Sequence, residues 1–341
     1  MVRLGVIGAG WFASRRHMPD AQADANVELV ALCRREAQAR ETMAARFGIE
    51  PRFAFEDWRA MLEGAELDAV LIATPNNLHY EQAKAALNAG LHVLLEKPMT
   101  IRAEHARELV ALADSSGLKL SVAVNPPFWA HCHKMRDALR RPEMGELESV
   151  SLFWTGSAEY VFGKAPAPDN LPGVVPPTMY RSDPEQNGGG YFADGGPHLV
   201  SELLWVSGLK ARRVTALMDA TPSDMRAVLS IELENGALAT LVALGDSKFP
   251  GRRVHNTFGA SNGSITVQDF AFETTIAIQG QEPLTFREAD LPPIGTPVGN
   301  FAQAISGQAE LLSPGLHGAD VVAVTEAAYR SAAEGRTITL D

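Results

Sequence analysis

Short apolar runs alternate with longer amphipathic segments over the first third of the chain. The runs predict five strands, at residues 3–7, 27–33, 69–74, 91–95 and 118–124. Three Ala-rich amphipathic segments, each closed by a glycine, predict helices at residues 36–47, 80–88 and 103–115. Strands that alternate with helices are typical of a parallel sheet with helices on both faces. We therefore predict an α/β fold that begins with a Rossmann doubly wound parallel sheet over residues 1–124.

After residue 124 the chain is richer in strand signals than in helix signals. Six segments are strand candidates, at residues 150–155, 214–218, 227–233, 237–244, 264–267 and 274–278. Asn235-Gly236 lies between two of them and indicates a type I′ hairpin turn. We predict a second domain of α+β type over residues 125–341.

Composition narrows the class of protein. A chain of 341 residues and 36.7 kDa exceeds the size at which one core keeps growing, which agrees with two domains. The net charge of -11 argues against a nucleic-acid or anionic-membrane partner, because both require basic patches. Only Cys33 and Cys132 occur, in no paired motif, so we expect neither disulfide nor zinc. No signal peptide or membrane-spanning run is evident, and we expect a cytoplasmic protein.

A glycine-rich turn follows the first predicted strand. Gly8-Ala9-Gly10-Trp11-Phe12-Ala13 matches the G-x-G-x-x-G/A dinucleotide fingerprint in its expected context, between a strand and a helix. Gly8 permits the tight turn, Gly10 lets the backbone approach a pyrophosphate, and the helix N-terminus favours the anion. A simple glycine turn is the alternative. We expect Gly8, Gly10, Trp11 and Phe12 to contact the cofactor.

The end of the second predicted strand indicates which dinucleotide binds. NAD sites usually place an acid there, whereas this chain has Cys33-Arg34-Arg35. A guanidinium can hold a 2′-phosphate, so we expect Cys33, Arg34 and Arg35 at the cofactor and NADP in preference to NAD, with NAD still possible. The alternative is that both arginines only begin the next solvated helix.

Loops after the next strands face the same crevice. Glu96-Lys97-Pro98 follows an apolar run, and Pro98 keeps Lys97 out of the helical region, although most lysines simply extend into solvent. The candidate cofactor contacts of these loops are Thr74, Pro75, Asn76, His79, Glu96, Lys97 and Asn125. An N-cap role for Asn76 is compatible with a cofactor contact.

Asp194 and His198 are four residues apart, so a helix here would place them on one face. A histidine can take and return a proton near neutral pH, and a carboxylate partner stabilises its cation. The alternative is an N-cap aspartate and a first-turn histidine without a chemical role.

A Pro- and Gly-rich stretch over residues 156–187 is long for a connection and predicts a functional loop. Its Tyr160, Tyr180 and Arg181 are candidates for recognising a substrate through aromatic faces and hydrogen bonds. His131-Cys132-His133 does not predict a metal site, because residues two apart on a helix point in different directions.

Several motifs together resemble the glucose-fructose oxidoreductase / inositol dehydrogenase (Gfo/Idh/MocA) family. They are the glycine fingerprint, the 73–79 and 96–98 loops, Tyr180-Arg181-x-Asp183, the 188–198 stretch and the terminal helical segment at residues 318–335. The resemblance implies a Rossmann domain followed by a large, mainly antiparallel open sheet that carries the substrate. It also implies His198 as general acid/base, Asp194 as its partner at the sugar, and Lys97 on the reacting oxygen.

These observations predict an NAD(P)-dependent oxidoreductase that transfers a hydride between nicotinamide and a secondary alcohol or ketone carbon of a sugar, sugar derivative or polyol. The catalytic candidates are Lys97, Asp194 and His198, and the same three with Tyr160, Tyr180 and Arg181 are the candidates for binding substrate. A redox-neutral glycosidase or lyase that uses the cofactor transiently is the main alternative, and a non-catalytic dinucleotide sensor is another. We expect a homodimer or homotetramer formed through the second domain's sheet.

Overall fold

The computed structural model describes residues 1–168, 171, 173–249 and 251–340. The chain forms two compact units. Unit 1 comprises Met1–Val124, Ala165–Asn187 and Gly295–Ala319, and unit 2 comprises Asn125–Lys164, Gly188–Ile294 and Asp320–Asp341. Two segments from the second half of the sequence therefore belong to the first unit, which the sequence pattern did not indicate.

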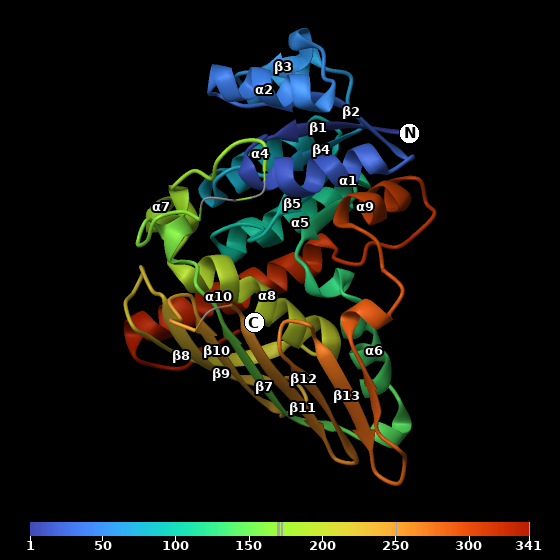
Figure 1. Ribbon diagram of the computed structural model, residues 1–341, viewed down its shortest axis with the longest axis vertical. Coiled ribbons are helices and arrows are strands. Elements are labelled where there is room, and N and C mark those ends of the chain that lie inside the picture. The colour runs from blue at the N-terminus through green and yellow to red at the C-terminus, as the bar shows by residue number, and fades with distance from the viewer. Residues whose placement is uncertain (169–170, 172, 250, 341) are drawn as a thin grey trace. The chain divides into compact units, whose positions relative to one another are not determined.

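Unit 1 is built on a six-stranded parallel sheet in the order β3-β2-β1-β4-β5-β6 (Figure 1). The strands are β1 (Val2–Ile7), β2 (Val27–Cys33), β3 (Ala54–Phe55), β4 (Ala69–Ile72), β5 (His92–Glu96) and β6 (Leu120–Ala123). The helices are α1 (Met18–Ala23), α2 (Ala37–Phe47), α3 (Trp58–Gly64), α4 (His79–Asn88), α5 (Ala103–Ser116), α7 (Pro184–Asn187) and α9 (Pro297–Ile305). The predicted doubly wound sheet is confirmed. The two-residue strand β3 was not among the predicted strands.

Glycines end two of the unit 1 helices as the sequence predicted. Gly48 after α2 and Gly117 after α5 have φ values of 71° and 66°, in the left-handed region that glycine adopts without a Cβ penalty. The helix that follows the glycine turn contains a π-helical segment, η1 (Ala13–His17), in which Ser14 and His17 are buried. Such π turns are frequent at functional sites.

Unit 2 contains a nine-stranded sheet in the order β14-β13-β12-β11-β7-β10-β9-β8-β15. The strands are β7 (Leu147–Thr155), β8 (Ala211–Met218), β9 (Arg226–Leu233), β10 (Leu238–Leu244), β11 (Arg253–Ala260), β12 (Gly263–Gln268), β13 (Glu273–Ile278), β14 (Leu284–Phe286) and β15 (Ile338–Thr339). Among the described residues of this sheet, β7 and β10 are the only strands that pair in parallel, so the implied mainly antiparallel sheet is confirmed. The sequence pattern did not predict β11, because its buried Asn256 interrupts the apolar alternation.

The hairpin between β9 and β10 is present, but the predicted type I′ turn is wrong. That turn needs a positive φ at both central residues, and only Gly236 has one, at 90°. The side chain of Asn235 instead accepts a hydrogen bond from Ala237 N at 3.0 Å and donates one to Leu147 O at 2.9 Å. These side-chain bonds favour a different turn.

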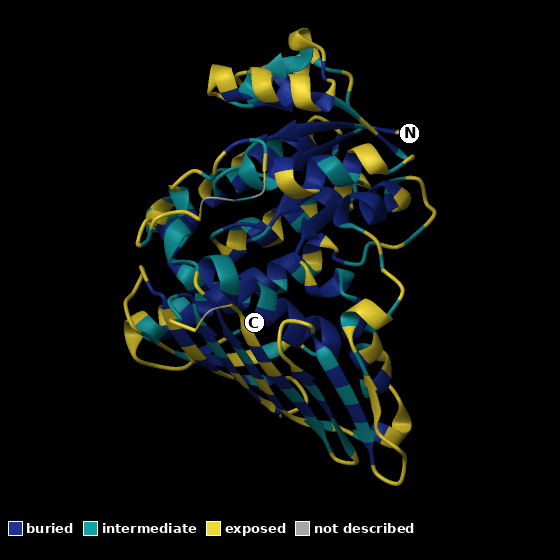
Figure 2. Cartoon of the chain, viewed as in Figure 1, coloured by how far each residue is buried: buried dark blue, intermediate teal, exposed yellow. Residues whose placement is uncertain are grey.

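Helices α6 (Ala130–Leu139), α8 (Tyr191–Ser207) and α10 (Gly315–Glu334) contribute to the core of unit 2 with the inner residues of the sheet. Buried and exposed positions alternate along the strands, as Figure 2 shows, so one face of the sheet is packed and the other is open. Within the described part of the chain, no helix combines the length and apolar character needed to cross a membrane.

Candidate functional site

A cavity of about 790 Å³ opens along the carboxyl ends of β1, β2, β4 and β5 in unit 1. Open parallel sheets bind ligands at this edge. Thirteen of the sequence-predicted site residues line it: Gly8, Trp11, Phe12, Cys33, Arg34, Arg35, Thr74, Pro75, Asn76, Glu96, Lys97, Tyr180 and Arg181. The structure therefore assembles most of the expected cofactor contacts in one place.

The glycine turn has the shape of a cradle. Gly8 has a φ of 85°, and a Cβ at this position would lie 2.7 Å from Thr74 Cγ2 and 2.8 Å from the Ala73 carbonyl. The amides of Gly8 and Ala9 both donate to Cys33 O at 3.1 Å, which ties the turn to the end of β2. Only glycine fits position 8, and the turn leaves room for a group bound above it.

Arg34 closes over this turn. Its Nη1 donates to Ala9 O at 3.3 Å and lies 3.4 Å from where a Cβ of Gly10 would be. Burial lowers the pKa of Arg34, and its Nε is buried without a hydrogen-bond partner among the described residues. Arg35, beside it on the cavity wall, is exposed. A half-buried guanidinium with an unused donor at this edge fits an anionic group of a dinucleotide.

Two of the acids near Arg34 and Arg35 cap helices. The Glu36 carboxylate caps α2, accepting from Gln38 N at 2.8 Å and Ala39 N at 2.7 Å. Asp57 Oδ1 caps α3 in the same way, accepting from Arg59 N at 2.8 Å. Strand β2 ends at Cys33 and is followed by Arg34, where NAD sites usually place an acid. Burial raises the pKa of the Cys33 thiol to about 12, which disfavours its thiolate.

Trp58 and Arg59 line the cavity as well, although no sequence motif indicated them. The Arg59 guanidinium lies 4.1 Å from the centroid of the Trp58 ring and pairs with Glu81. This arrangement forms a flat, fixed surface at the cavity wall.

The loop after β4 is held from two sides. The side chain of Asn76, which is 1% exposed, donates to Asn187 O at 2.9 Å, and Thr74 Oγ1 donates to Gln82 Oε1 at 2.7 Å. His79 is fully buried, does not line the cavity, and places its ring nitrogens 2.9 Å from Pro98 O and 3.0 Å from Thr74 O. His79 therefore links the loop after β4 to the loop that contains Lys97 and Pro98. Burial lowers the pKa of His79.

The Glu96-Lys97 corner contains a buried pair that the sequence did not reveal. Glu96 Oε1 lies 2.5 Å from Nε2 of His17, which η1 supplies and which is 2% exposed. Glu96 Oε2 accepts the backbone N–H of Lys97 at 2.9 Å. Both carboxylate oxygens thus hold the chain at this corner, and Lys97 lines the cavity from it. The Lys97–Pro98 peptide is cis.

Asp194 and His198 belong to unit 2, on helix α8. The N-cap is Gly190, so Asp194 is a helical residue of the first turn and not the cap. Their spacing places them on one face of the helix, as the sequence predicted. The ring of His198 stacks near Trp154, with centroids 6.4 Å apart and planes 27° apart.

Distant residues fix the start of α8. Tyr329 Oη accepts from Gly190 N and Ala193 N, each at 3.0 Å, and donates to Asp224 Oδ1 at 2.6 Å. Asp224 Oδ2 accepts from Phe192 N at 2.9 Å, and burial raises the pKa of Asp224 to about 6. A Cβ on Gly190 would lie 2.2 Å from Asp224 O, which explains the glycine. No local pattern pointed to Asp224 or Tyr329.

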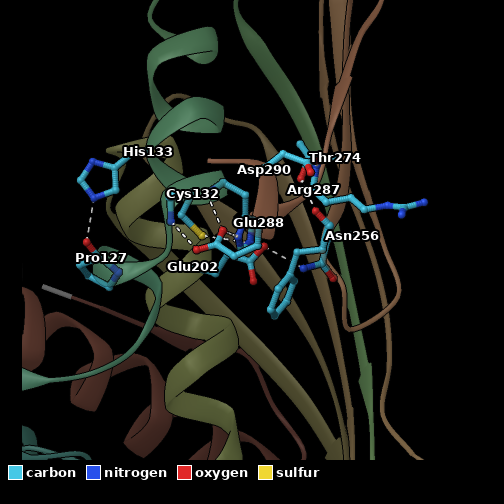
Figure 3. Close-up of polar contacts among 12 residues, drawn as sticks. Pro127, Cys132, His133, Glu202, Asn256, Thr274, Arg287, Glu288 and Asp290 are labelled. Carbon is cyan, nitrogen blue, oxygen red and sulfur yellow. Dashed lines mark hydrogen bonds and ion pairs between the residues drawn. The ribbon is translucent and has the colours of Figure 1, made fainter. Parts of the chain in front are cut away.

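A buried polar network holds the middle of α8. Asn256 Nδ2 of β11 donates to Glu202 Oε1 at 2.7 Å, and burial raises the pKa of Glu202 (Figure 3). Nearby, Glu288 Oε2 lies 2.6 Å from His131 Nδ1, and His133 Nε2 lies 2.8 Å from Pro127 O. Both histidines of the 131–133 motif therefore have structural partners. Among the described residues no three His, Cys, Asp or Glu side chains form a metal-binding group.

The remaining candidates also lie in unit 2. Tyr160 is half-buried on η6 (Glu159–Phe162), and Asn125 is exposed at the start of η4 (Pro126–Phe128). Neither lines the unit 1 cavity.

Comparison with known proteins identifies similarities over both halves of the chain. The family model described as "Oxidoreductase family, NAD-binding Rossmann fold" matches residues 2–124, and the GFO/IDH/MocA C-terminal domain model matches residues 132–265. The rhizopine catabolism protein MocA of Rhizobium meliloti is 31% identical over 257 residues, which is 73% of each chain.

Two further relatives align over the full length. The 1,5-anhydro-D-fructose reductase of Ensifer adhaerens is 26% identical over 100% of this chain and 99% of its own. The WlbA dehydrogenase of Bordetella pertussis, solved with NADH and UDP-GlcNAcA, superposes with a TM-score of 0.80 at 26% identity, covering 100% of this chain and 99% of that one.

Proposed function

The chain belongs to the Gfo/Idh/MocA family of oxidoreductases with an NAD-binding Rossmann fold, and from this membership we propose that it oxidises or reduces a sugar, sugar derivative or polyol. The proposed reaction is hydride transfer at a secondary alcohol or ketone carbon, with NADP preferred. Relatives named as sugar reductases and dehydrogenases support the substrate class.

The observation that carries this proposal is the cavity that joins the Gly8 cradle to Lys97 along one sheet edge. The cradle and the buried Arg34 Nε fit a dinucleotide. The residues that would hold it are Gly8, Trp11, Arg34, Arg35, Thr74 and Asn76. The bound nicotinamide supplies the hydride donor or acceptor.

Three side chains perform the remaining chemistry in this proposal. Lys97, as an ammonium, donates a hydrogen bond to the reacting oxygen and stabilises the negative charge that grows on it. His198 removes the hydroxyl proton in oxidation and returns it in reduction. Asp194, one turn earlier on α8, orients the imidazole and stabilises its cation.

The preference for NADP rests on Arg34 and Arg35. Arg34 follows the end of β2, where NAD sites usually have an acid, and the nearby carboxylates of Glu36 and Asp57 already cap helices. We expect Arg34→Asp to raise the KM for NADP by at least about tenfold, the cost of one charge-assisted hydrogen bond, and to leave the KM for NAD much less changed. A wild-type enzyme that uses NAD as well as NADP, with KM values unaffected by Arg34→Asp, would refute this preference.

A screen of aldoses, inositols, deoxy-ketosugars and anhydrosugars with NADP tests the reaction. The expected result is a net change in nicotinamide absorbance with one sugar class. Product formed without that change would point to the redox-neutral alternative. If the protein binds the cofactor but turns over none of these sugars, the result would favour a non-catalytic dinucleotide sensor.

We also propose that a second copy of the chain covers the open face of the unit 2 sheet. Leu217, Val228 and Val242 are cross-strand neighbours on β8, β9 and β10, and the first two are 73% and 45% exposed. An apolar row of this kind is typical of an interface. Light scattering that shows only a monomer at micromolar concentration would contradict this assembly.

A further inference from the structure

An aromatic cluster of unit 2 begins beside His198 and ends at an exposed arginine. The ring of Trp154, near the end of β7, stacks near the His198 ring, with centroids 6.4 Å apart. Phe270, in the turn between β12 and β13, meets the Trp154 ring edge-on, with centroids 6.3 Å apart. The Arg252 guanidinium lies 4.8 Å from the Phe270 ring centroid. A series of three ring contacts therefore connects His198 with a cation.

The register of the sheet explains why these residues meet. Strands β12, β11 and β7 are neighbours in the sheet (Figure 1). Trp154 of β7 pairs with Val254 of β11, and both side chains are buried on the face that the helices cover. Side chains alternate along a strand, so Arg252 lies toward the same face as Val254, in agreement with its stacking on Phe270. Arg253, the residue between them, points to the open face.

The charge of Arg252 is not matched by a neighbouring acid. Two acids follow the parallel strands β7 and β10 at this end of the sheet, and both are engaged with other cations: Asp246 Oδ1 lies 2.9 Å from Arg226 Nε, and Glu159 Oε1 lies 3.0 Å from Lys248 Nζ. Within the described part of the chain, Arg252 forms no ion pair. Its guanidinium is thus held on an aromatic ring with its hydrogen-bond donors available to an anion.

Arg252 also lies near the start of α8. Burial and the charge of Asp194 raise the pKa of Tyr191, the first residue of α8, to about 12, while the charge of Arg252 opposes the rise. Both charges therefore act on the same hydroxyl group. On its other side Arg252 packs against the chain after β7, where a Cβ on Gly156 would lie 3.3 Å from Arg252 Cγ. The contact with Phe270 and the effect on Tyr191 agree in placing Arg252 beside the turn of α8 that carries Asp194.

We propose that this cluster binds the substrate and that Arg252 selects a sugar that carries a carboxylate or phosphate group. The inference rests on the proposed function and narrows its substrate to acidic sugars. Aromatic faces pack on the C–H surface of a sugar ring, and a guanidinium binds a carboxylate or phosphate through paired, charge-assisted hydrogen bonds. Phe270 is 44% exposed and Arg252 is exposed, so both can meet a ligand, whereas the buried Trp154 holds them beside His198.

The position of Arg252 also indicates which part of the sugar it binds. The rings of Trp154 and Phe270 lie between Arg252 and His198 in the series of contacts, so the acidic group binds away from the carbon that reacts. An acidic group at the end of the sugar, such as a C6 carboxylate or phosphate, fits this separation. Because its contact with Arg252 is the same before and during hydride transfer, it should lower the KM and leave kcat nearly unchanged.

Matched acidic and neutral sugars test the proposal. D-glucuronate and D-glucose 6-phosphate differ from D-glucose only at C6, so together they also distinguish a carboxylate from a phosphate. With the protein saturated with NADP, we expect calorimetry to show one acidic sugar binding about 10- to 100-fold more tightly than glucose. Arg252→Met should remove most of this difference, and Arg252→Lys should recover part of it. Wherever turnover is measurable, the preference should appear in the KM.

Arg253→Met is the matched control. The Arg253 guanidinium also stacks on an aromatic ring, 3.4 Å from the Phe249 centroid, but this neighbouring residue belongs to the open face of the sheet. We expect the variant to bind all three sugars as the wild type does. Circular dichroism and thermal melting of the three variants show whether each is folded.

The outcomes separate this inference from the proposed function. A wild-type protein that binds neither acidic sugar more tightly than glucose would overturn the inference, and so would a folded Arg252→Met that keeps the preference. Loss of the preference in Arg253→Met would move the acid-binding group to the open face and also overturn it. A wild-type protein that binds an acidic sugar through Arg252, but neither oxidises nor reduces any sugar, would refute the proposed function and leave this binding site in place.

Discussion

Lys97 and the Asp194–His198 pair are positioned in different ways. Lys97 sits at a backbone corner, where Glu96 uses one oxygen on the Lys97 N–H and the other on the buried His17. Asp194 and His198 sit on a regular helix, whose first amides are held by Asp224 and Tyr329. At Lys97 one of the two supporting contacts comes from the neighbouring Glu96 and the other from His17 behind it, whereas at α8 these contacts come from residues more than 20 positions away. The comparison predicts which variants should impair chemistry alone and which should also unfold their surroundings.

The largest expected effect is that of Lys97→Ala. Removing one preorganised donor to a developing charge typically lowers kcat by about 100- to 1000-fold. Because Lys97 lines the cavity and is not a core residue, we expect the melting temperature to change little. Steady-state kinetics and calorimetry check both parts. A variant that keeps near-normal kcat would remove the lysine from the chemistry.

The next effect is expected from His17→Leu. The change leaves the buried Glu96 carboxylate without its partner, and breaking a buried pair costs about 3–5 kcal/mol. Chemical denaturation should show this loss of stability together with a fall in kcat. Glu96→Gln combined with His17→Leu removes the orphaned charge, so the double variant should recover part of the stability. If the double variant is no more stable than His17→Leu, the His17–Glu96 pair does not stabilise the Glu96-Lys97 corner.

Tyr329→Phe tests the corresponding support in unit 2, with a smaller expected effect. It deprives Gly190 N and Ala193 N of their acceptor and Asp224 of a donor, at a cost of about 1–3 kcal/mol. If the start of α8 positions His198, kcat should fall while the dissociation constant for NADPH stays unchanged. We expect the contacts that hold Lys97 and those that hold the start of α8 to act independently. Weaker NADPH binding in Tyr329→Phe would contradict that independence.

The smallest expected effect is a pH dependence of stability at Asp224. In the folded protein the pKa of Asp224 is about 6, above the ordinary aspartate value of 3.8, so the native state binds the proton more tightly than the unfolded state does. The stability that Asp224 contributes is therefore highest at low pH and is lost as pH rises from about 4 to about 6. Urea unfolding across this range should show the free energy of unfolding of the wild type, measured relative to Asp224→Asn, decreasing and then levelling off. A difference independent of pH would contradict the raised pKa.

Local motifs explain how much of the site could be predicted. Gly8, Arg34, Thr74 and Lys97 each follow a predicted strand, and parallel strands bring their carboxyl ends to one edge, so the cavity lining could be anticipated. Trp58 and Arg59 of this lining could not be anticipated, and neither could the buried His17 that contacts Glu96, because a helical histidine or an arginine after a tryptophan has many other uses. The assignments of residues to catalysis, cofactor and substrate, and the domain boundary at residue 124, stay predictions.

The sequence by itself determined the alternation of strands and helices in unit 1, the glycine turn and the helical spacing of Asp194 and His198, because all three depend on neighbouring residues. The tertiary structure decided where residues 173–187 lie, how His17 holds Glu96 and what fixes the start of α8. Those contacts join residues that are 32 to 160 positions apart, such as Phe192 with Asp224, His17 with Glu96 and Ser14 with Val174. No local pattern encodes such pairings, since they depend on which surfaces the packed elements bring together.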